Sequence, residues 1–166
     1  MERLEMDVLM IRVHACMNSG RYAEARRLLE AVLTEEPAHG VAHGMMGWIL
    51  WALVEDHERA LEHFRCAVRW APHFVNSWKH YLNLLAGDGH EQELHEACAR
   101  ALHVPGIDRA EVHAIVARYL ERSGRPEQAM DAFRRARDQA VTDAARNEHR
   151  AAVRRLRARR RRAFWS

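Results

Sequence analysis

Apolar residues recur at steps of three and four along most of the chain, in short segments that are separated by turn residues. In one such segment, residues 22–35, Ala25, Leu29 and Val32 share one helical face, and the segment ends before Pro37, because proline cannot continue a helix. A similar segment over about residues 4–18 precedes it and ends at Gly20, and glycine supplies the left-handed conformation with which many helices end. The pattern therefore predicts two helices joined by a tight turn, an αα-hairpin.

The core of the second helix repeats along the chain at steps of 35, 34 and 35 residues. The later copies consist of Ala60, Phe64 and Ala67; Leu94, Cys98 and Ala101; and Ala129, Phe133 and Ala136. A period of this length is typical of stacked helical repeats, in which each hairpin buries its apolar stripe against its neighbours. We predict an all-α fold with four hairpin repeats in residues 1–141, at about 6–39, 40–73, 74–108 and 109–141. Residues 142–166 would form a C-terminal capping helix.

Composition places the chain among ordinary globular proteins. Its 166 residues suit one domain, with 48% hydrophobic and 30% charged residues. No apolar run is long enough to span a membrane, and the first residues lack the pattern of a signal peptide, so we expect a cytoplasmic protein. The three cysteines, Cys16, Cys66 and Cys98, have no paired spacing, which predicts reduced thiols.

Charge is distributed unevenly along the chain. Residues 150–166 contain eight arginines and no acidic residue, which leaves 18 basic and 23 acidic residues in the rest of the chain. Such a tail could contact nucleic-acid phosphates, an anionic membrane surface or the acidic body of a second copy, or it could be only a solvated cap. The residues that would bind an anion are Arg155, Arg157, Arg159, Arg160, Arg161 and Arg162, with Phe164 and Trp165 exposed after them.

The repeats resemble the tetratricopeptide repeat (TPR) family over about residues 6–141. The second repeat matches its pattern best, and its matching residues are Met46, Gly47, Ala60, Phe64, Ala67 and Pro72. The resemblance implies a right-handed superhelix whose concave face binds peptides or helices of partner proteins. One departure is Glu55, which stands where the other repeats have Gly20, Gly89 or Gly124.

The second repeat carries an extra residue, either in this turn or in the loop 38–40, and the choice rotates its first helix by about 100°. We favour the arrangement that puts Gly47 at the small site of the pattern, which turns Trp48 rather than Ile49 toward the concave face.

Mapped onto the chain, the concave face has two unlike halves. The first would be an adaptable apolar groove, since methionine side chains repack easily, although the same methionines could instead be core between repeats. It would consist of Met10, His14, Met17, Met45 and Trp48. The second would bind an acidic or carboxylate-bearing peptide, or be an ordinary solvated face, and it would consist of Asn76, Lys79, Asn83, Arg118 and Arg122. Lys79 and Asn83 resemble half of the carboxylate clamp of chaperone-binding TPR proteins, but Ile115 stands where the clamp has asparagine.

Candidate catalytic or metal-binding sets do not emerge from the sequence. Twelve histidines are spread over the chain, and we interpret them as exposed and solvated. The step of five between His90 and His95 differs from the step of four by which two histidines on one helical face bind zinc. We therefore expect a non-catalytic scaffold or adaptor without cofactor or metal, which binds a peptide or helix of an unidentified protein. A second copy of the chain is a further candidate partner, and the alternative function is anion binding through the arginine tail, to RNA or to acidic membranes.

Overall fold

The computed structural model describes the backbone of residues 3–165 and the side chains of residues 4–162. The described chain consists of helices joined by short turns, and it divides into two compact units, residues 1–84 and 85–166. The elements of the first unit are α1 (Arg3–Asn18), α2 (Tyr22–Glu35), α3 (Gly40–Ile49), η1 (Leu50–Val54), α4 (His57–Trp70) and most of α5 (Val75–Asp88). Those of the second are the end of α5, α6 (Glu91–Ala101), α7 (Arg109–Arg122), α8 (Pro126–Gln139) and α9 (Asp143–Trp165).

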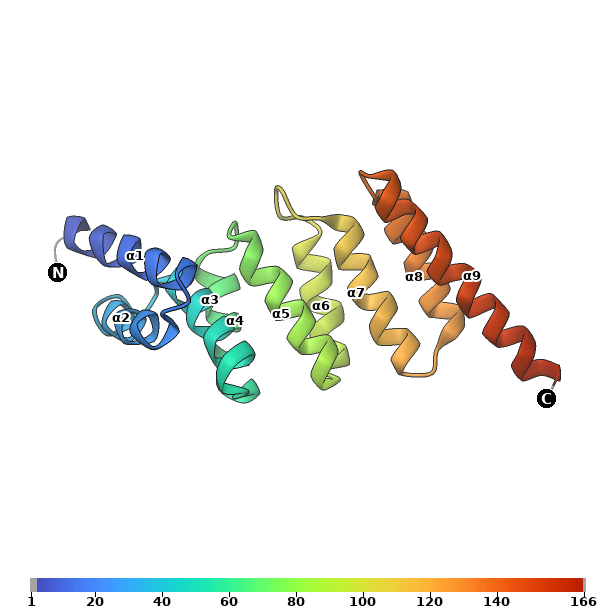
Figure 1. Cartoon of the computed structure of the whole chain (residues 1–166), viewed down its shortest axis with the longest axis horizontal. Helices are drawn as coiled ribbons and strands as arrows, with labels where there is room; N and C mark the ends of the chain where they lie inside the picture. Colours follow the sequence, from blue (N-terminus) through green and yellow to red (C-terminus); the bar gives the residue numbers. More distant parts are fainter. Residues whose placement is uncertain (1–2, 166) are drawn as a thin grey trace. The chain divides into compact units, whose positions relative to one another are not determined.

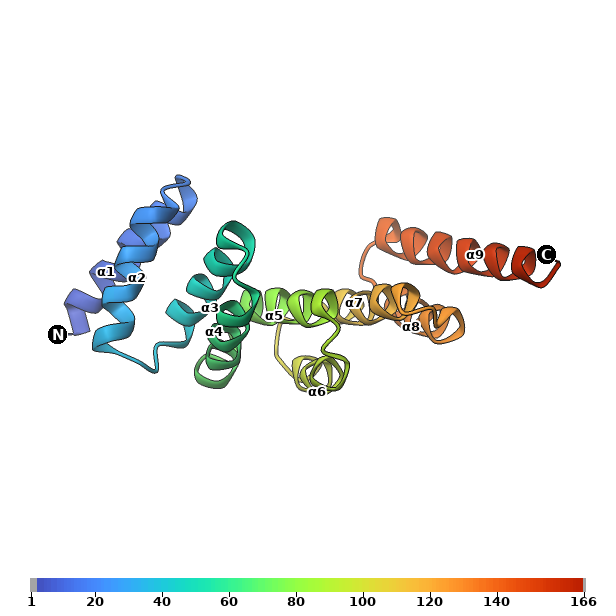
Figure 2. The same cartoon turned by 90° about the horizontal axis from the view of Figure 1, so that it is seen from below.

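The first unit is built from the helix pairs α1–α2 and α3–α4, with α2 also packed on α3 (Figures 1 and 2). Its core contains the residues that the helical pattern predicts, among them Ala25, Leu29, Val32, Ala60 and Phe64, all of them fully buried. Small alanines let neighbouring helices approach closely, and the Phe64 ring fills the space between them.

The extra residue of the second repeat is accommodated in a π-helical turn, η1, which directly follows α3. A π-turn absorbs one additional residue without breaking the helix, and it ends at Glu55, whose φ of 59° is in the left-handed region. Gly47 faces the Phe64 ring so closely that a Cβ atom added to Gly47 would lie 3.0 Å from it. Trp48 is only half-buried. Gly47 thus faces the core, as the favoured arrangement predicts, whereas the place of Trp48 on a concave face stays a prediction.

The second unit has α7 packed against α8 and α8 packed against α9 (Figure 1). The left-handed turn at Gly124, with φ of 72°, joins α7 to α8. The last helix buries Ala152, Val153 and Leu156, and it continues through the arginine run to Trp165. The side chains of Phe164 and Trp165, predicted to be exposed, lie outside the described residues.

The helix pairs thus follow the hairpin pattern of the sequence, while the exact limits predicted for the four repeats and the cap stay a prediction. Among the described helices, none combines the length and the apolar character that crossing a membrane requires.

Candidate functional site

The first unit contains a pocket of about 370 Å³ that is lined by helices α1 and α3 and by the start of α5. Four residues that the sequence predicts for an apolar groove line it together: His14, Met17, Met45 and Trp48. Asn76, predicted for the polar half, lines the same pocket. Met10 lies one helical turn before His14 on α1 and is not among the lining residues. We call this pocket the groove; its other lining residues are Asn18, Tyr22, Gly44, Phe74, Ser77 and His80.

Helical spacing explains why these side chains meet. His14 and Met17 are three residues apart on α1, and so are Met45 and Trp48 on α3, so each pair shares one helical face. The Trp48 ring lies 5.4 Å from the ring of Tyr22. Met17, Met45 and Trp48 are all half-buried, which leaves part of each side chain accessible from the groove.

A buried hydroxyl lies at the base of the groove. Ser77 is 1% exposed, and its Oγ has no hydrogen-bond partner among the described residues. Gly44 lies directly beside it, so close that a Cβ atom added there would come within 2.1 Å of the Ser77 Oγ. Burying a hydroxyl group without a hydrogen bond is unfavourable by about 1–3 kcal/mol. Because Ser77 lines the groove, a change of its side-chain rotamer would bring this hydroxyl to a bound ligand.

The groove lacks permanently charged side chains. No Asp, Glu, Lys or Arg is among its lining residues. Burial, with a smaller contribution from the Lys79 ammonium, lowers the pKa of His80 below its ordinary value, which favours the uncharged ring. The His80 ring lies 5.9 Å from Trp51 and 6.3 Å from Phe64. The groove therefore combines aromatic and thioether surface with neutral hydrogen-bonding groups.

Three of the other four predicted polar residues, Asn83, Arg118 and Arg122, form contacts within their own units. In the first unit, the amide of Asn83 donates a hydrogen bond to the Lys79 carbonyl oxygen at 2.8 Å, within one turn of α5, and Lys79 itself is exposed. In the second unit, Arg118 forms an ion pair with Glu111 at 2.8 Å, and Arg122 donates to the Ala86 carbonyl oxygen at 2.9 Å. Their joint role in binding an acidic peptide stays a prediction.

Ile115, at the position where the carboxylate clamp has asparagine, is buried in the second unit. Its side chain contributes to the core and offers no hydrogen bond to a ligand.

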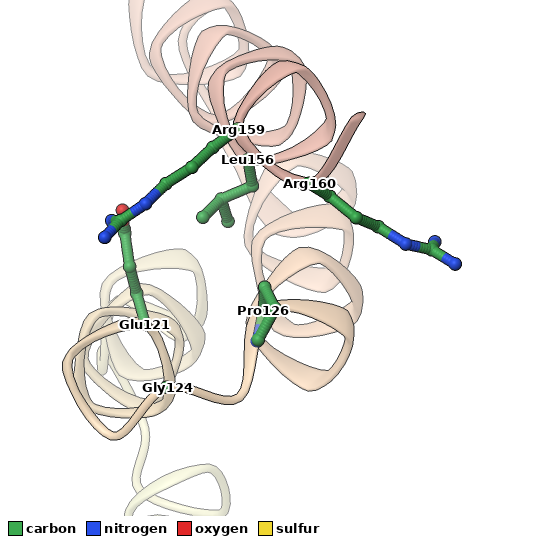
Figure 3. A pocket seen from close by; sticks show the side chains of 6 residues that line it. All are labelled: Glu121, Gly124, Pro126, Leu156, Arg159 and Arg160. Carbon is green, nitrogen blue, oxygen red and sulfur yellow. The ribbon is translucent and has the colours of Figure 1, made fainter. Parts of the chain in front are cut away.

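In the second unit, residues of the arginine tail and of the turn between α7 and α8 line a small pocket of about 280 Å³ (Figure 3). Leu156 points into this pocket above the turn at Gly124 and Pro126 (Figure 3). Two of the predicted anion-binding arginines form ion pairs with this unit: Arg155 with Glu121 at 2.8 Å and Arg160 with Glu127 at 2.5 Å. The other four predicted anion-binding arginines, Arg157, Arg159, Arg161 and Arg162, are exposed.

The interpretation of the histidines as exposed and solvated is wrong for several of them. His149 is buried, with its ring 6.2 Å from Phe133. The Nδ1 atoms of His43 and His63 are 2.9 Å apart. His43 Nε2 lies 2.9 Å from the Pro37 carbonyl oxygen, to which it can only donate.

Burial, followed by the charges of His43 and Arg59, lowers the pKa of His63 to about 4. Within the described part of the chain, no three His, Cys, Asp or Glu side chains lie close enough together to hold a metal ion.

The sequence did not predict six of the groove residues: Asn18, Tyr22, Gly44, Phe74, Ser77 and His80. His80 could have been found, because it lies one helical turn after Asn76 on α5. Ser77 gives no such signal, since a serine in a helix becomes notable only when its burial and missing hydrogen bond are known.

Known proteins resemble this chain in structure rather than in sequence. No protein-family model matches the sequence, and no curated protein is significantly similar to it. Solved structures do match. PilF of Pseudomonas aeruginosa has a TM-score of 0.74 at 15% identity over 95% of this chain and 69% of its own. The fragment of MamA from residue 41, from Desulfovibrio magneticus RS-1, has a TM-score of 0.74 at 16% identity over 93% and 85%. YrrB, described as a TPR protein with an unusual peptide-binding site, has a TM-score of 0.69 at 17% identity over 84% and 71%.

The fold is TPR-like. This confirms the predicted fold class, an all-α array of stacked αα-hairpins, and the resemblance on which it was based. The groove lies along α1 and α3.

Proposed function

We propose that this TPR-like protein is a non-catalytic interaction scaffold whose groove binds a peptide or helix of a partner protein. The observation that carries the proposal is the meeting of Met17, Met45 and Trp48 around one pocket that also contains the unpartnered hydroxyl of Ser77. Aromatic and methionine side chains are typical of binding surfaces, because they provide large contact area and adapt to the shape of a ligand.

The chemistry of the groove favours an apolar anchor residue on the partner. At about 370 Å³ the pocket is near the lower end of the sizes that hold small ligands, which suits one or two side chains of a peptide. Since its lining carries no Asp, Glu, Lys or Arg, an ionic anchor would lose its hydration without gaining a partner. Ser77, Asn18 and Asn76 can instead exchange hydrogen bonds with the backbone of the peptide.

Two further observations support a peptide as the ligand. YrrB, whose fold is similar, is described as a TPR protein with an unusual peptide-binding site. The arginine tail, the alternative binding surface, has two of its six candidate arginines already in ion pairs with Glu121 and Glu127. We therefore propose that the partner contacts the groove. We also propose that the protein acts as an adaptor in the cytoplasm.

A random-peptide phage library selected against the full-length protein tests this function. We expect the enriched peptides to share an apolar or aromatic anchor, and we expect Met45→Ala together with Trp48→Ala to weaken their binding by about tenfold or more. Trp70→Ala is the matched control, because Trp70 is a half-exposed tryptophan on α4 outside the groove. Selected peptides that bind the groove variant as tightly as the parent protein would refute the proposal.

A further inference from the structure

The outer face of α1 carries an apolar stripe that the groove does not use. Leu4, Val8 and Ile11 are 73%, 49% and 67% exposed, and Ala15, one turn further, is also exposed. The face of α1 that packs into the unit is the opposite one, with Val13 and Cys16 buried. Steps of four, three and four residues place the stripe in a single line along the helix, the spacing by which two helices pack side by side.

We propose that this stripe is a self-association surface, on which α1 of a second copy of the chain packs antiparallel. When the two helices are related by a two-fold axis near their middle, Val8 lies opposite Ile11 of the second copy, and Leu4 lies opposite Ala15. All four apolar residues are then covered, and each pairing occurs twice, because the surface is complementary to itself, as a two-fold interface requires.

The charges beside the stripe support this orientation. A two-fold axis perpendicular to the helices carries each flank of α1 onto the same flank of the second copy. On one flank Glu5 then lies within one turn of the other copy's Arg12, and on the other flank Asp7 lies near its His14. Opposite charges thus face each other on one flank, and a carboxylate faces a histidine on the other. Such flanking pairs set the orientation and choice of partner in helix pairs.

Within one chain, Arg12 is held only weakly. Its guanidinium lies 4.0 Å from the Glu24 carboxylate, and its side chain is 57% exposed. It can therefore turn toward a second copy at small cost. The surface is short, since a 16-residue helix is about 24 Å long, so we expect a dimer that dissociates in the micromolar range rather than a permanent one.

Sedimentation equilibrium of the full-length protein from about 1 to 300 µM tests the proposal, since this range brackets a weak interface. The wild-type chain should show a reversible monomer–dimer equilibrium. Ile11→Asp should weaken it by about tenfold or more, because it places a charge in the seam of both copies. Leu53→Asp is the matched control: Leu53 is 46% exposed in the same unit but lies in η1, away from the stripe, and its substitution should leave the equilibrium unchanged.

Charge reversal tests the orientation of the two helices, and this test remains valid even if Ile11→Asp disturbs the fold. Glu5→Arg alone and Arg12→Glu alone should each weaken the dimer by about fivefold, and the two together should restore it. A wild-type chain that stays monomeric would overturn the proposal, and a partner protein of different sequence would then be the candidate that covers the stripe. So would a dimer that is indifferent to Ile11→Asp in a folded variant, or a double reversal that fails to restore association.

Discussion

The hydroxyl oxygen of Ser77 occupies the space where a side chain on Gly44 would be, since a Cβ atom added to Gly44 would lie 2.1 Å from it. A glycine on α3 and a small polar residue on α5 thus let the two helices approach closely at the base of the groove. The same close packing leaves the Ser77 hydroxyl buried without a hydrogen-bond partner among the described residues. Stability and binding should therefore pull in opposite directions at this position.

Ser77→Ala should raise the free energy of unfolding by about 1 kcal/mol, because it removes a buried, unsatisfied hydroxyl. The same variant should bind groove-selected peptides more weakly. Urea denaturation and a peptide titration measure the two effects. Ser19→Ala is the control. The Ser19 hydroxyl donates to the Ala15 carbonyl oxygen at 2.8 Å, so its removal should not raise the free energy of unfolding. A Ser77→Ala protein that is less stable than the parent would show that the hydroxyl is satisfied.

Glu55→Gly should stabilise the protein by about 0.5–1 kcal/mol. Glu55 has a φ of 59°, a conformation that is unfavourable by about 1–2 kcal/mol for a residue with a Cβ atom. Glycine avoids this cost, but it loses more conformational entropy on folding, so the net gain in stability is smaller. Gly20→Ala makes the reverse change at a φ of 72° and should destabilise. Thermal unfolding of both variants gives the comparison, and an unchanged or lowered midpoint for Glu55→Gly would contradict it.

Acidification should weaken the first unit through His63. In the unfolded chain this ring takes up a proton near its ordinary pKa of 6.5, whereas in the fold it does so only at about 4. The unfolded state thus binds more protons between these values, and the stability present above pH 6.5 is lost as the pH falls toward 4. His63 is partly exposed, so we expect a loss of about 1–2 kcal/mol, smaller than the full shift would give.

His63→Phe should make the pH dependence of unfolding shallower without abolishing it, because burial also lowers the pKa of His80 and His113. Urea denaturation between pH 7.5 and 4, roughly the window set by the histidine pKa values, measures the slope. An equal slope in the parent and the variant would show that His63 has no part in it.

Phe64→Ala should destabilise by about 3–5 kcal/mol, since it opens a cavity at a fully buried site beside Gly47. Trp70→Ala removes a larger ring that is half-exposed and should be much less damaging. Chemical denaturation separates the two. Similar losses for both would mean that Phe64 is not part of a close-packed core.

The arginine tail should be dispensable for groove binding. Changing Arg159, Arg161 and Arg162 together to Gln removes three exposed charges and leaves the ion pairs of Arg155 and Arg160 in place. The affinity for groove-selected peptides at about 0.15 M salt, where exposed charges are largely screened beyond about 8 Å, should stay within about twofold. A steep loss would return the tail to consideration as the main binding surface.

The sequence was sufficient to predict the hairpins, because the core positions keep a nearly constant spacing and the turns of the other three repeats have glycine, although the second has Glu55. It also placed Gly47 correctly, since a side chain at this position would crowd the Phe64 ring. It did not reveal the π-turn at Leu50–Val54, because one extra residue can be absorbed at several points with little change in the pattern.

The groove was predictable only in part. His14, Met17, Met45 and Trp48 follow from helical faces, which are a local property of the chain. Ser77 does not, because its isolation depends on the approach of α3 and α5, which no local pattern encodes. The pairing of His43 with His63 is a contact between helices α3 and α4 of the same kind.

The indole N–H signal of Trp48 provides the most direct test of the groove. In a titration of the full-length protein with a groove-selected peptide, followed by ¹H–¹⁵N correlation spectra, this signal should shift to saturation at the same affinity as the peptide binds. The Trp70 indole signal, from α4 outside the groove, should stay where it is. A bound peptide that leaves the Trp48 signal unmoved would contradict the proposal that the groove holds the partner.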